Sequence, residues 1–334
     1  MQTNPTVSSE GRTVEGNSLS ALSVAQILSA FQSGQITTPR MVSDSAATVA
    51  GNLDALQTIA AAGKLATITL TDSGFPSLSV TAGQLTADAL ALGDLSGNFT
   101  LQIDGSAPAF STQSIAGLNG HGNSVAFQNS ASSYSITAAA DKSGVNVIYL
   151  NAFLGFTDHL SGIQALKFSD YSLIIAQTPG SSTVTTGNVT ELYGAVFGRL
   201  PDVPGLSFYQ GQLQANPALP LTTFAQWFLA SPEYTNNSAH NYAQTTAGDT
   251  QFITDCYNNL LHRGPEAGAA AWYETNVIAP FLVGLTPGTA AYAAAETLAH
   301  AYVLTDFSAS QEFLNAVQVT ATNQASAQHW LVLI

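Results

Sequence analysis

The chain has 334 residues and a formal net charge of −14, with 7 Lys and Arg against 21 Asp and Glu. So few cations exclude a basic nucleic-acid-binding surface and electrostatic docking on anionic lipid, because both need clustered Lys and Arg. A hydrophobic fraction of 46% excludes a disordered chain. The single cysteine, Cys256, excludes an intrachain disulfide and a cysteine-rich metal site. We therefore expect a folded acidic protein whose surface consists mainly of small neutral residues.

The first part of the chain predicts a module of helices and strands over residues 19–106, preceded by a polar arm over 1–18. Apolar residues at helical spacing predict helices over 22–31, 47–60 and 85–92. Period-two alternation predicts strands over 65–71, 78–80 and 99–103. Asp44 is expected to cap the second helix, and Thr81 with Gln84 forms a capping-box pattern for the third.

Residues 107–178 are predicted to be rich in β-strands. Turn signals such as Asp141-Lys142-Ser143-Gly144 separate stretches in which apolar residues alternate at period two. These stretches are 125–127, 134–136, 145–147 and 173–175. Segment 179–188 is rich in Pro, Gly, Ser and Thr and shows no periodicity, which indicates a linker between domains.

Residues 189–318 are predicted to form a helical domain with an internal repeat at an offset of 64 residues. Each copy has an amphipathic helix, a turn with Arg and Pro, and a second helix with an aromatic pair. The corresponding residues are Arg199 and Arg263, Phe208-Tyr209 and Trp272-Tyr273, and the helix starts at Ser231 and Ser310. The expected fold class is α+β: an N-terminal helix and strand module, a central β-rich segment and a C-terminal all-α repeat domain.

The two ends of the chain bear on its location. Residues 1–18 lack the positive and apolar regions of a secretory signal, and no apolar run is long enough to span a membrane. The tail 319–334 ends in Trp330-Leu331-Val332-Leu333-Ile334 after a polar stretch, which suits an uncleaved C-terminal secretion signal. We expect an extracellular or cell-surface location, reached without a cleaved N-terminal signal peptide and without membrane insertion.

The helical domain carries a family resemblance. Its first copy reads Leu192-Tyr193-x3-Phe197-Gly198-Arg199-x-Pro201-Asp202-x2-Gly205, followed by Ser231-Pro232-Glu233-Tyr234. This motif resembles a bacterial helical domain of unknown function that is found near the C-termini of large exported proteins, including RTX-type exoproteins and S-layer-like surface proteins. The second copy departs from it, with Gly264-Pro265-Glu266 at the acidic turn and Ala269 in place of Gly205.

Two further stretches, 157–170 and 42–56, are similar to segments of such bacterial surface proteins. Together the resemblances imply a protein exported by a type I system. They imply no known catalytic activity.

Sequence patterns of known catalytic sites are missing. The chain has no His-Glu-x-x-His helix, no phosphate-binding Walker loop and no G-x-S-x-G elbow. No two of its six histidines have the i, i+4 spacing of a zinc site. Cys256 corresponds to Leu192 in the repeat and is expected to be a buried apolar residue rather than a nucleophile. We therefore expect no enzymatic activity.

Calcium is the one cofactor that the sequence leaves open, because exoproteins of the kind it resembles often bind this ion. The glycine- and aspartate-rich nonapeptide repeat of calcium-binding β-rolls is missing. Carboxylates near predicted turns could still supply oxygen ligands, and these are Asp72, Asp104, Asp141, Asp158 and Asp170. The favoured alternative is that each of these side chains caps its own turn.

The repeat also contains two candidate structural sites, around Arg199 and Arg263. Each arginine could pair with a carboxylate of its turn, Asp202 or Glu266, or bond the carbonyls at the helix end. We predict that both stabilise the turn between two helices.

The aromatic pairs of the repeat admit two interpretations. Tyr209 and Tyr273, with the ring that precedes each, could form a carbohydrate-stacking surface. Aromatic residues at helical spacing more often belong to a hydrophobic core, and the core interpretation is favoured.

For the function, we expect a non-enzymatic surface protein that assembles with copies of itself into a layer, filament or matrix. Low charge leaves little electrostatic repulsion between copies, and few long charged side chains must be ordered at a contact. The arm 1–18 is expected to be ordered by a neighbouring copy. The alternative is an adhesin that binds a cell-surface glycan or another surface protein.

Overall fold

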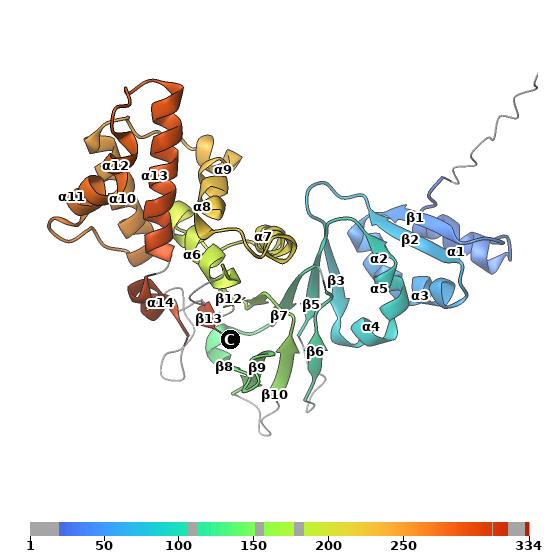
Figure 1. Ribbon diagram of the computed structural model, residues 1–334. Coiled ribbons are helices and arrows are strands. Elements are labelled where there is room, and N and C mark those ends of the chain that lie inside the picture. The colour runs from blue at the N-terminus through green and yellow to red at the C-terminus, as the bar shows by residue number, and fades with distance from the viewer. Residues whose placement is uncertain are drawn as a thin grey trace, which may run out of the picture. The chain divides into compact units, whose positions relative to one another are not determined.

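The computed structural model describes residues 20–105, 112–119, 121–150, 157–176, 184–308, 310–319 and 331–333 (Figure 1). Strands and helices are mixed in the first half and helices dominate the second, so the predicted α+β class is confirmed. The chain divides into two compact units. The described residues up to 71 and residues 88–97 form unit 1, and residues 72–87 and those from 98 onward form unit 2. The predicted arm 1–18 lies outside the described residues.

Unit 1 combines a small parallel sheet with short helices. Its strands are β1 (Arg40–Asp44), β2 (Leu65–Leu70) and β4 (Leu95–Ser96), in the order β1-β2-β4. Its helices are α1 (Val24–Gln32), α2 (Ala46–Gly51), α3 (Leu53–Ala61) and α5 (Ala89–Gly93). Ile27, Val42, Leu56 and Ile68 are fully buried and form the core of this unit.

The predicted role of Asp44 as a helix cap is wrong. Asp44 ends strand β1, which the sequence patterns do not predict, and Ser45 caps α2 by accepting a hydrogen bond from the N–H of Thr48. The carboxylate of Asp44 instead accepts from the N–H groups of Val24 at 3.0 Å and Ser45 at 2.9 Å. These hydrogen bonds lower the pKa of Asp44 and join the start of α1 to the end of β1.

Unit 2 contains a six-stranded sheet with the order β13-β12-β11-β7-β5-β3. The strands are β3 (Ser77–Thr81), β5 (Thr100–Asp104), β7 (Gly122–Ala126), β11 (Ala165–Lys167), β12 (Ser172–Ala176) and β13 (Leu331–Leu333). All neighbours are parallel except β11 and β12, and α4 (Ala82–Ala87) follows β3. The expected boundary at residue 106 therefore falls between two paired strands of one sheet, β5 and β7.

A second sheet of unit 2 has the order β6-β10-β9-β8. Its strands are β6 (Ser114–Ala116), β8 (Tyr134–Ala138), β9 (Gly144–Tyr149) and β10 (Thr157–Ser161), with the short helix η1 (Ala131–Ser133) before β8. The β8–β9 hairpin turns at Asp141-Lys142-Ser143, where Lys142 has a positive φ of 59°. Asp141 accepts hydrogen bonds from the N–H and the hydroxyl of Ser143, which close this turn.

The rest of unit 2 is helical. Its first copy of the repeat contains α6 (Thr186–Phe197), α7 (Val203–Ala215), α8 (Leu221–Leu229) and α9 (Pro232–Thr235), followed by η2 (Ser238–His240). Its second copy contains α10 (Thr246–Leu261), α11 (Ala269–Tyr273), the π-helix η3 (Glu274–Ile278), α12 (Ala279–Leu282), α13 (Ala290–Ser308) and α14 (Gln311–Val317). α6 starts inside the expected linker 179–188, because Thr185 and Asn188 form a capping box there.

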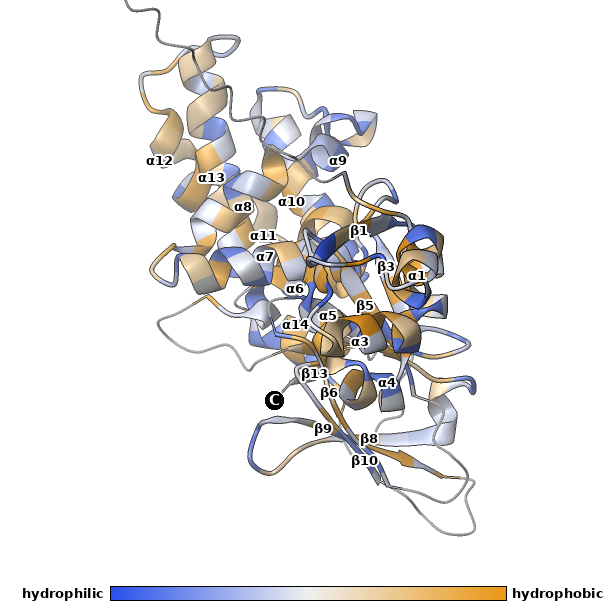
Figure 2. Ribbon diagram, turned by 90° about the vertical axis from the view of Figure 1, so that its right-hand side faces the viewer, coloured by the Kyte–Doolittle hydropathy of each residue, from blue (hydrophilic) through white to orange (hydrophobic). Residues whose placement is uncertain are grey.

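Helix α13 joins the two copies of the repeat. It packs against α6 and α8 of the first copy and against α10 and α12 of the second, as Figure 1 shows. Figure 2 shows both hydrophobic and hydrophilic residues along α8, α10 and α13. Phe224, Phe228 and Phe313 are among the largest fully buried side chains. The repeat therefore has one shared core rather than two.

Candidate functional site

Arg199 lies in the turn that follows α6, and its guanidinium group makes contacts both within this turn and with α9. Its Nε and Nη2 atoms donate to the two carboxylate oxygens of Glu233 at 2.8 and 2.7 Å, and its Nη1 donates to the carbonyl of Leu200 at 2.8 Å. Nη1 also lies 3.4 Å from a carboxylate oxygen of Asp202, whose other oxygen caps α7 by accepting from the N–H of Gly205. The guanidinium thus connects the α6–α7 turn to the start of α9.

Arg263 makes the corresponding contacts in the second copy. Its Nη2 atom lies 2.6 Å from the carboxylates of both Glu266 and Glu312, and its Nη1 donates to the carbonyl of Gly264 at 3.1 Å. The guanidinium lies 5.3 Å from the ring centroid of Tyr257. Each arginine is therefore balanced by one carboxylate of its own turn, Asp202 or Glu266, and by a second from a distant short helix, Glu233 or Glu312.

The two aromatic pairs of the repeat are each divided between core and surface. Tyr209 is 8% exposed and stacks on Phe228 at 4.8 Å between ring centroids, whereas Phe208 is 48% exposed. In the second copy, Tyr273 is half-buried and stacks on a core phenylalanine, whereas Trp272 is 54% exposed. The expected core position is therefore wrong for the first ring of each pair.

The calcium candidates are dispersed over the fold. Asp158 accepts from the N–H of Gln113 at 3.2 Å, and burial raises the pKa of its carboxyl group. Asp170 accepts from the N–H groups of Ala131 and Tyr171 at 2.9 and 3.1 Å. Asp104 ends β5, and Asp72 begins the segment of unit 2 that leads into β3. Among the residues that the structure describes, no three His, Cys, Asp or Glu side chains are arranged to hold a metal ion.

The second copy contains a buried pair of titratable side chains, Asp249 and His300. No local sequence motif indicates this pair. Nε2 of His300 on α13 lies 2.7 Å from Oδ1 of Asp249 on α10. His300 is 7% exposed and Asp249 is 1% exposed, and the imidazole stacks on Phe252 at 3.9 Å with an interplanar angle of 11°. This pair joins α10 to α13 across the interior of the domain.

Glu274, the first residue of the π-helix η3, extends this pair. Burial and the neighbouring charge of Asp249 raise the pKa of Glu274, and the nearby side chain of Thr246 opposes this rise. Within the described ranges, no donor reaches the buried Oδ2 of Asp249 or Oε2 of Glu274. Burial and the charge of the neighbouring carboxylate both favour the protonated form of Glu274. Asp249 in turn positions His300 through their 2.7 Å contact.

Glu296 on α13 lies near the same cluster, and burial raises the pKa of its carboxyl group. Burial also raises the thiol pKa of Cys256, which keeps that residue an uncharged part of the core. The sequence feature that could have indicated the cluster is the pair Glu296 and His300, two titratable residues four positions apart in an alanine-rich helix. Asp249, the partner of His300, is 51 positions away in the sequence, so no spacing rule connects them.

Glu191 on α6 is a second buried acid. It is 0% exposed, and neither carboxylate oxygen has a hydrogen-bond partner among the described residues. Burial raises the pKa of this carboxyl group to about 9. Glu191 is therefore neutral at pH 7 in the folded protein.

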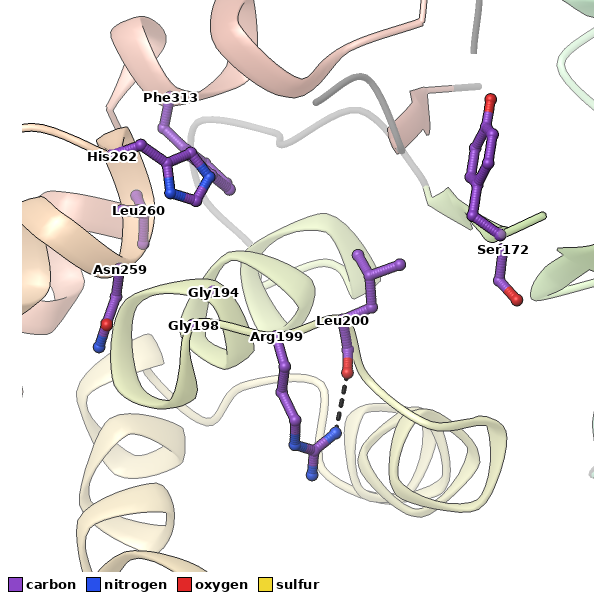
Figure 3. A pocket seen from close by; sticks show the side chains of 10 residues that line it. Ser172, Gly194, Gly198, Arg199, Leu200, Asn259, Leu260, His262 and Phe313 are labelled. Carbon is purple, nitrogen blue, oxygen red and sulfur yellow. Dashed lines mark hydrogen bonds between the residues drawn. The ribbon is translucent and has the colours of Figure 1, made fainter. Parts of the chain in front are cut away.

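A cavity of about 220 Å³ lies where the ends of α6 and α10 approach the start of β12 (Figure 3). Both helices end in a left-handed residue at this cavity, Gly198 with φ 61° and His262 with φ 52°. Figure 3 shows the imidazole of His262 beside the ring of Phe313.

No protein-family model, curated protein or solved structure matches this chain. In the described part of the chain, every helix is too short or too polar to cross a membrane. The assignment of a function therefore rests on the residues and their geometry.

Proposed function

We propose that this chain is a non-enzymatic, secreted surface protein that associates with further copies of itself into a layer, filament or matrix. The supporting observation is the exposure of Phe208 and Trp272, at 48% and 54%, at corresponding positions of the two repeat copies. Aromatic residues are enriched in protein interfaces relative to the rest of the protein surface. Two such rings on one domain provide two contact points for neighbouring copies.

The character of the remaining surface supports the same proposal. Only 8% of the residues are charged, so contacts between copies bury few charges that would need desolvation. Arg199 and Arg263 are each engaged by two carboxylates, one of their own turn and one of a distant short helix. Neither arginine therefore offers an unbalanced positive charge to an acidic partner.

The test compares wild type with the double variant Phe208→Ser/Trp272→Ser by negative-stain microscopy and sedimentation velocity. Wild type is expected to form regular sheets or filaments, and the double variant to remain dispersed. Phe75→Ser is the matched control, because Phe75 is 43% exposed and lies outside the repeat, so it is expected to assemble. A wild-type protein that stays monomeric at high concentration, with and without Ca²⁺, contradicts the proposal.

A second candidate function is glycan binding by an adhesin, favoured by the exposed indole of Trp272. A planar aromatic ring open to solvent can stack on the apolar face of a sugar. A glycan array would then give signals with wild type that disappear in Trp272→Ser and persist in Phe75→Ser. An array without signals removes this candidate and leaves the first untouched.

A further inference from the structure

We propose that Ser143, in the turn of the β8–β9 hairpin, is a nucleophilic serine whose hydroxyl accepts an acyl group from an activated ester, with His159 as its general base. This inference goes beyond the proposed function and does not depend on self-assembly. It concerns a modification site, because a serine that is acylated once is an acceptor of the group rather than a catalyst of repeated turnover.

His159 connects Ser143 to Asn146. His159 of β10 lies opposite Asn146 of β9, and Nδ1 of the imidazole lies 2.9 Å from Oδ1 of Asn146. Nε2 of the same ring lies 3.3 Å from Oγ of Ser143. When Nδ1 is protonated and donates to the amide oxygen, Nε2 is left as an acceptor beside the serine hydroxyl. A nucleophile, a base and a residue that orients the base are the parts of a triad, in which an asparagine can take the third place.

Asp141 is a second acceptor at the same hydroxyl. Its Oδ1 accepts from the hydroxyl of Ser143 at 2.7 Å and from the N–H of Ser143 at 3.0 Å. These hydrogen bonds lower the pKa of the Asp141 carboxyl group, which makes it a weak base, whereas an imidazole takes up a proton near neutral pH. Asp141 therefore holds the serine in the turn, and rotation of the hydroxyl turns its hydrogen toward Nε2 of His159.

Reagents can reach this serine from solvent. Ser143 is exposed and His159 is half-buried, so neither group is enclosed in the core. Ser143 also lines a cavity of about 540 Å³, whose apolar lining includes Leu213, which is half-buried, and Pro217, which is exposed. The cavity offers room and apolar contacts for an acyl chain. The substrate class is therefore an activated ester with a short, uncharged acyl group.

The reaction is a transfer of the acyl group from one oxygen to another. Oγ of Ser143 attacks the carbonyl carbon of the ester, and its proton passes to Nε2 of His159. The bond between the carbonyl carbon and the oxygen of the leaving alcohol then breaks, and the alcohol leaves with the proton from His159. The products are an ester on Ser143 and a free alcohol, and no electrons are transferred.

The test is acetylation of the full chain by p-nitrophenyl acetate, followed by mass spectrometry of the whole protein and of its peptides. Wild type is expected to gain one acetyl group on Ser143. Neutral hydroxylamine should remove it, because this reagent cleaves an ester and leaves an amide on the neighbouring Lys142 intact. Ser132 is the matched control within the same protein, since it is exposed and its hydroxyl lies beside that of Ser130 rather than a histidine.

Variants separate the base from the residue that positions it. Ser143→Ala is expected to lose the hydroxylamine-sensitive label, and Lys142→Arg to keep it. His159→Gln should be labelled at least about tenfold more slowly. The labelling rate of wild type should rise from about pH 5 to about pH 8 as the imidazole loses its proton, and His159→Gln should lack this rise. Asn146→Asp keeps an acceptor for Nδ1 and should react like wild type, whereas Asn146→Leu should react more slowly.

Three results would overturn the proposal. They are an acetyl group found on Ser132 as often as on Ser143, a label that resists hydroxylamine, and a His159→Gln variant that reacts as fast as wild type. The first two are read from wild type alone, so they do not depend on the folding of any variant. Continued release of nitrophenol that Ser143→Ala abolishes would support the nucleophile and contradict only the non-enzymatic part of the proposed function.

Discussion

Nε2 of His300 and Oδ1 of Asp249 lie 2.7 Å apart in the interior of the helical domain, 51 positions apart in the sequence. Two helices from different parts of the second copy are thereby joined by a polar contact where an apolar contact would be usual. Such a contact tolerates the loss of both partners better than the loss of one, because a single partner is left buried without compensation.

Replacement of one member of this pair is expected to destabilise the fold strongly. Asp249→Ala leaves the imidazole of His300 buried without its acceptor, and a loss of about 1–3 kcal/mol is expected. The double variant Asp249→Ala/His300→Phe removes both polar groups and should lose less. Urea denaturation of the four proteins of the cycle measures this, and strictly additive losses would show that the pair is not coupled.

The carboxyl group of Glu274 should make stability depend on pH. Its pKa in the folded protein is raised, mainly by burial and next by Asp249. A raised pKa means that the folded state holds the proton more tightly than the unfolded state, so its contribution is complete at low pH and is lost as the pH rises through the folded value. Unfolding free energies of wild type should fall from pH 4 upward more steeply than those of Glu274→Gln. Parallel curves for the two proteins would contradict the raised pKa of Glu274.

Glu191 is expected to make stability fall with rising pH in the same direction as Glu274, and by more. Its pKa of about 9 in the folded protein lies well above the ordinary value of 4.5, so wild type must protonate this group on folding at neutral pH. Glu191→Gln removes that requirement and is expected to stabilise the protein by up to about 3 kcal/mol at pH 7. The difference should vanish near pH 4, where the carboxyl is protonated in both states. Guanidinium denaturation at both pH values checks it, and a gain that is equal at both would contradict the buried neutral acid.

Tyr209 is buried and the neighbouring Phe208 is exposed, so replacing these two residues is expected to affect stability very differently. Tyr209→Ala removes a ring that packs on Phe228, and a loss of about 3 kcal/mol is expected. Phe208→Ala removes a ring that is 48% exposed, and a change below about 0.5 kcal/mol is expected. Thermal unfolding of the two variants decides this, and similar losses for both would mean that Phe208 is part of the core.

Local patterns in the sequence predicted most of the elements. Alternation over 65–71 and 99–103 corresponds to β2 and β5, and the pattern of Thr81 with Gln84 corresponds to the start of α4. These signals are reliable because alternation and capping depend on residues only a few positions apart. The α+β class follows from them.

Such local patterns cannot predict contacts between residues that are far apart in the sequence. Strand β1 is short and mixed in polarity, and it forms because β2 offers it a parallel partner. The cluster of Asp249, His300 and Glu274 comes from three elements, and each residue alone has the spacing of an ordinary helix residue. Exposure of Phe208 beside a buried Tyr209 depends on which neighbour covers the helix, which periodicity does not determine.

The division of the chain into its two units has a consequence for how they can be separated. The backbone passes from one unit to the other at residues 71–72, 87–88 and 97–98. A cut after 97 would therefore remove strand β3 from the six-stranded sheet, and a cut after 71 would remove α5 and β4 from unit 1. Neither unit can therefore be excised, exchanged or duplicated as one contiguous segment of the chain. Each unit is completed only by residues that are synthesised after part of the other unit.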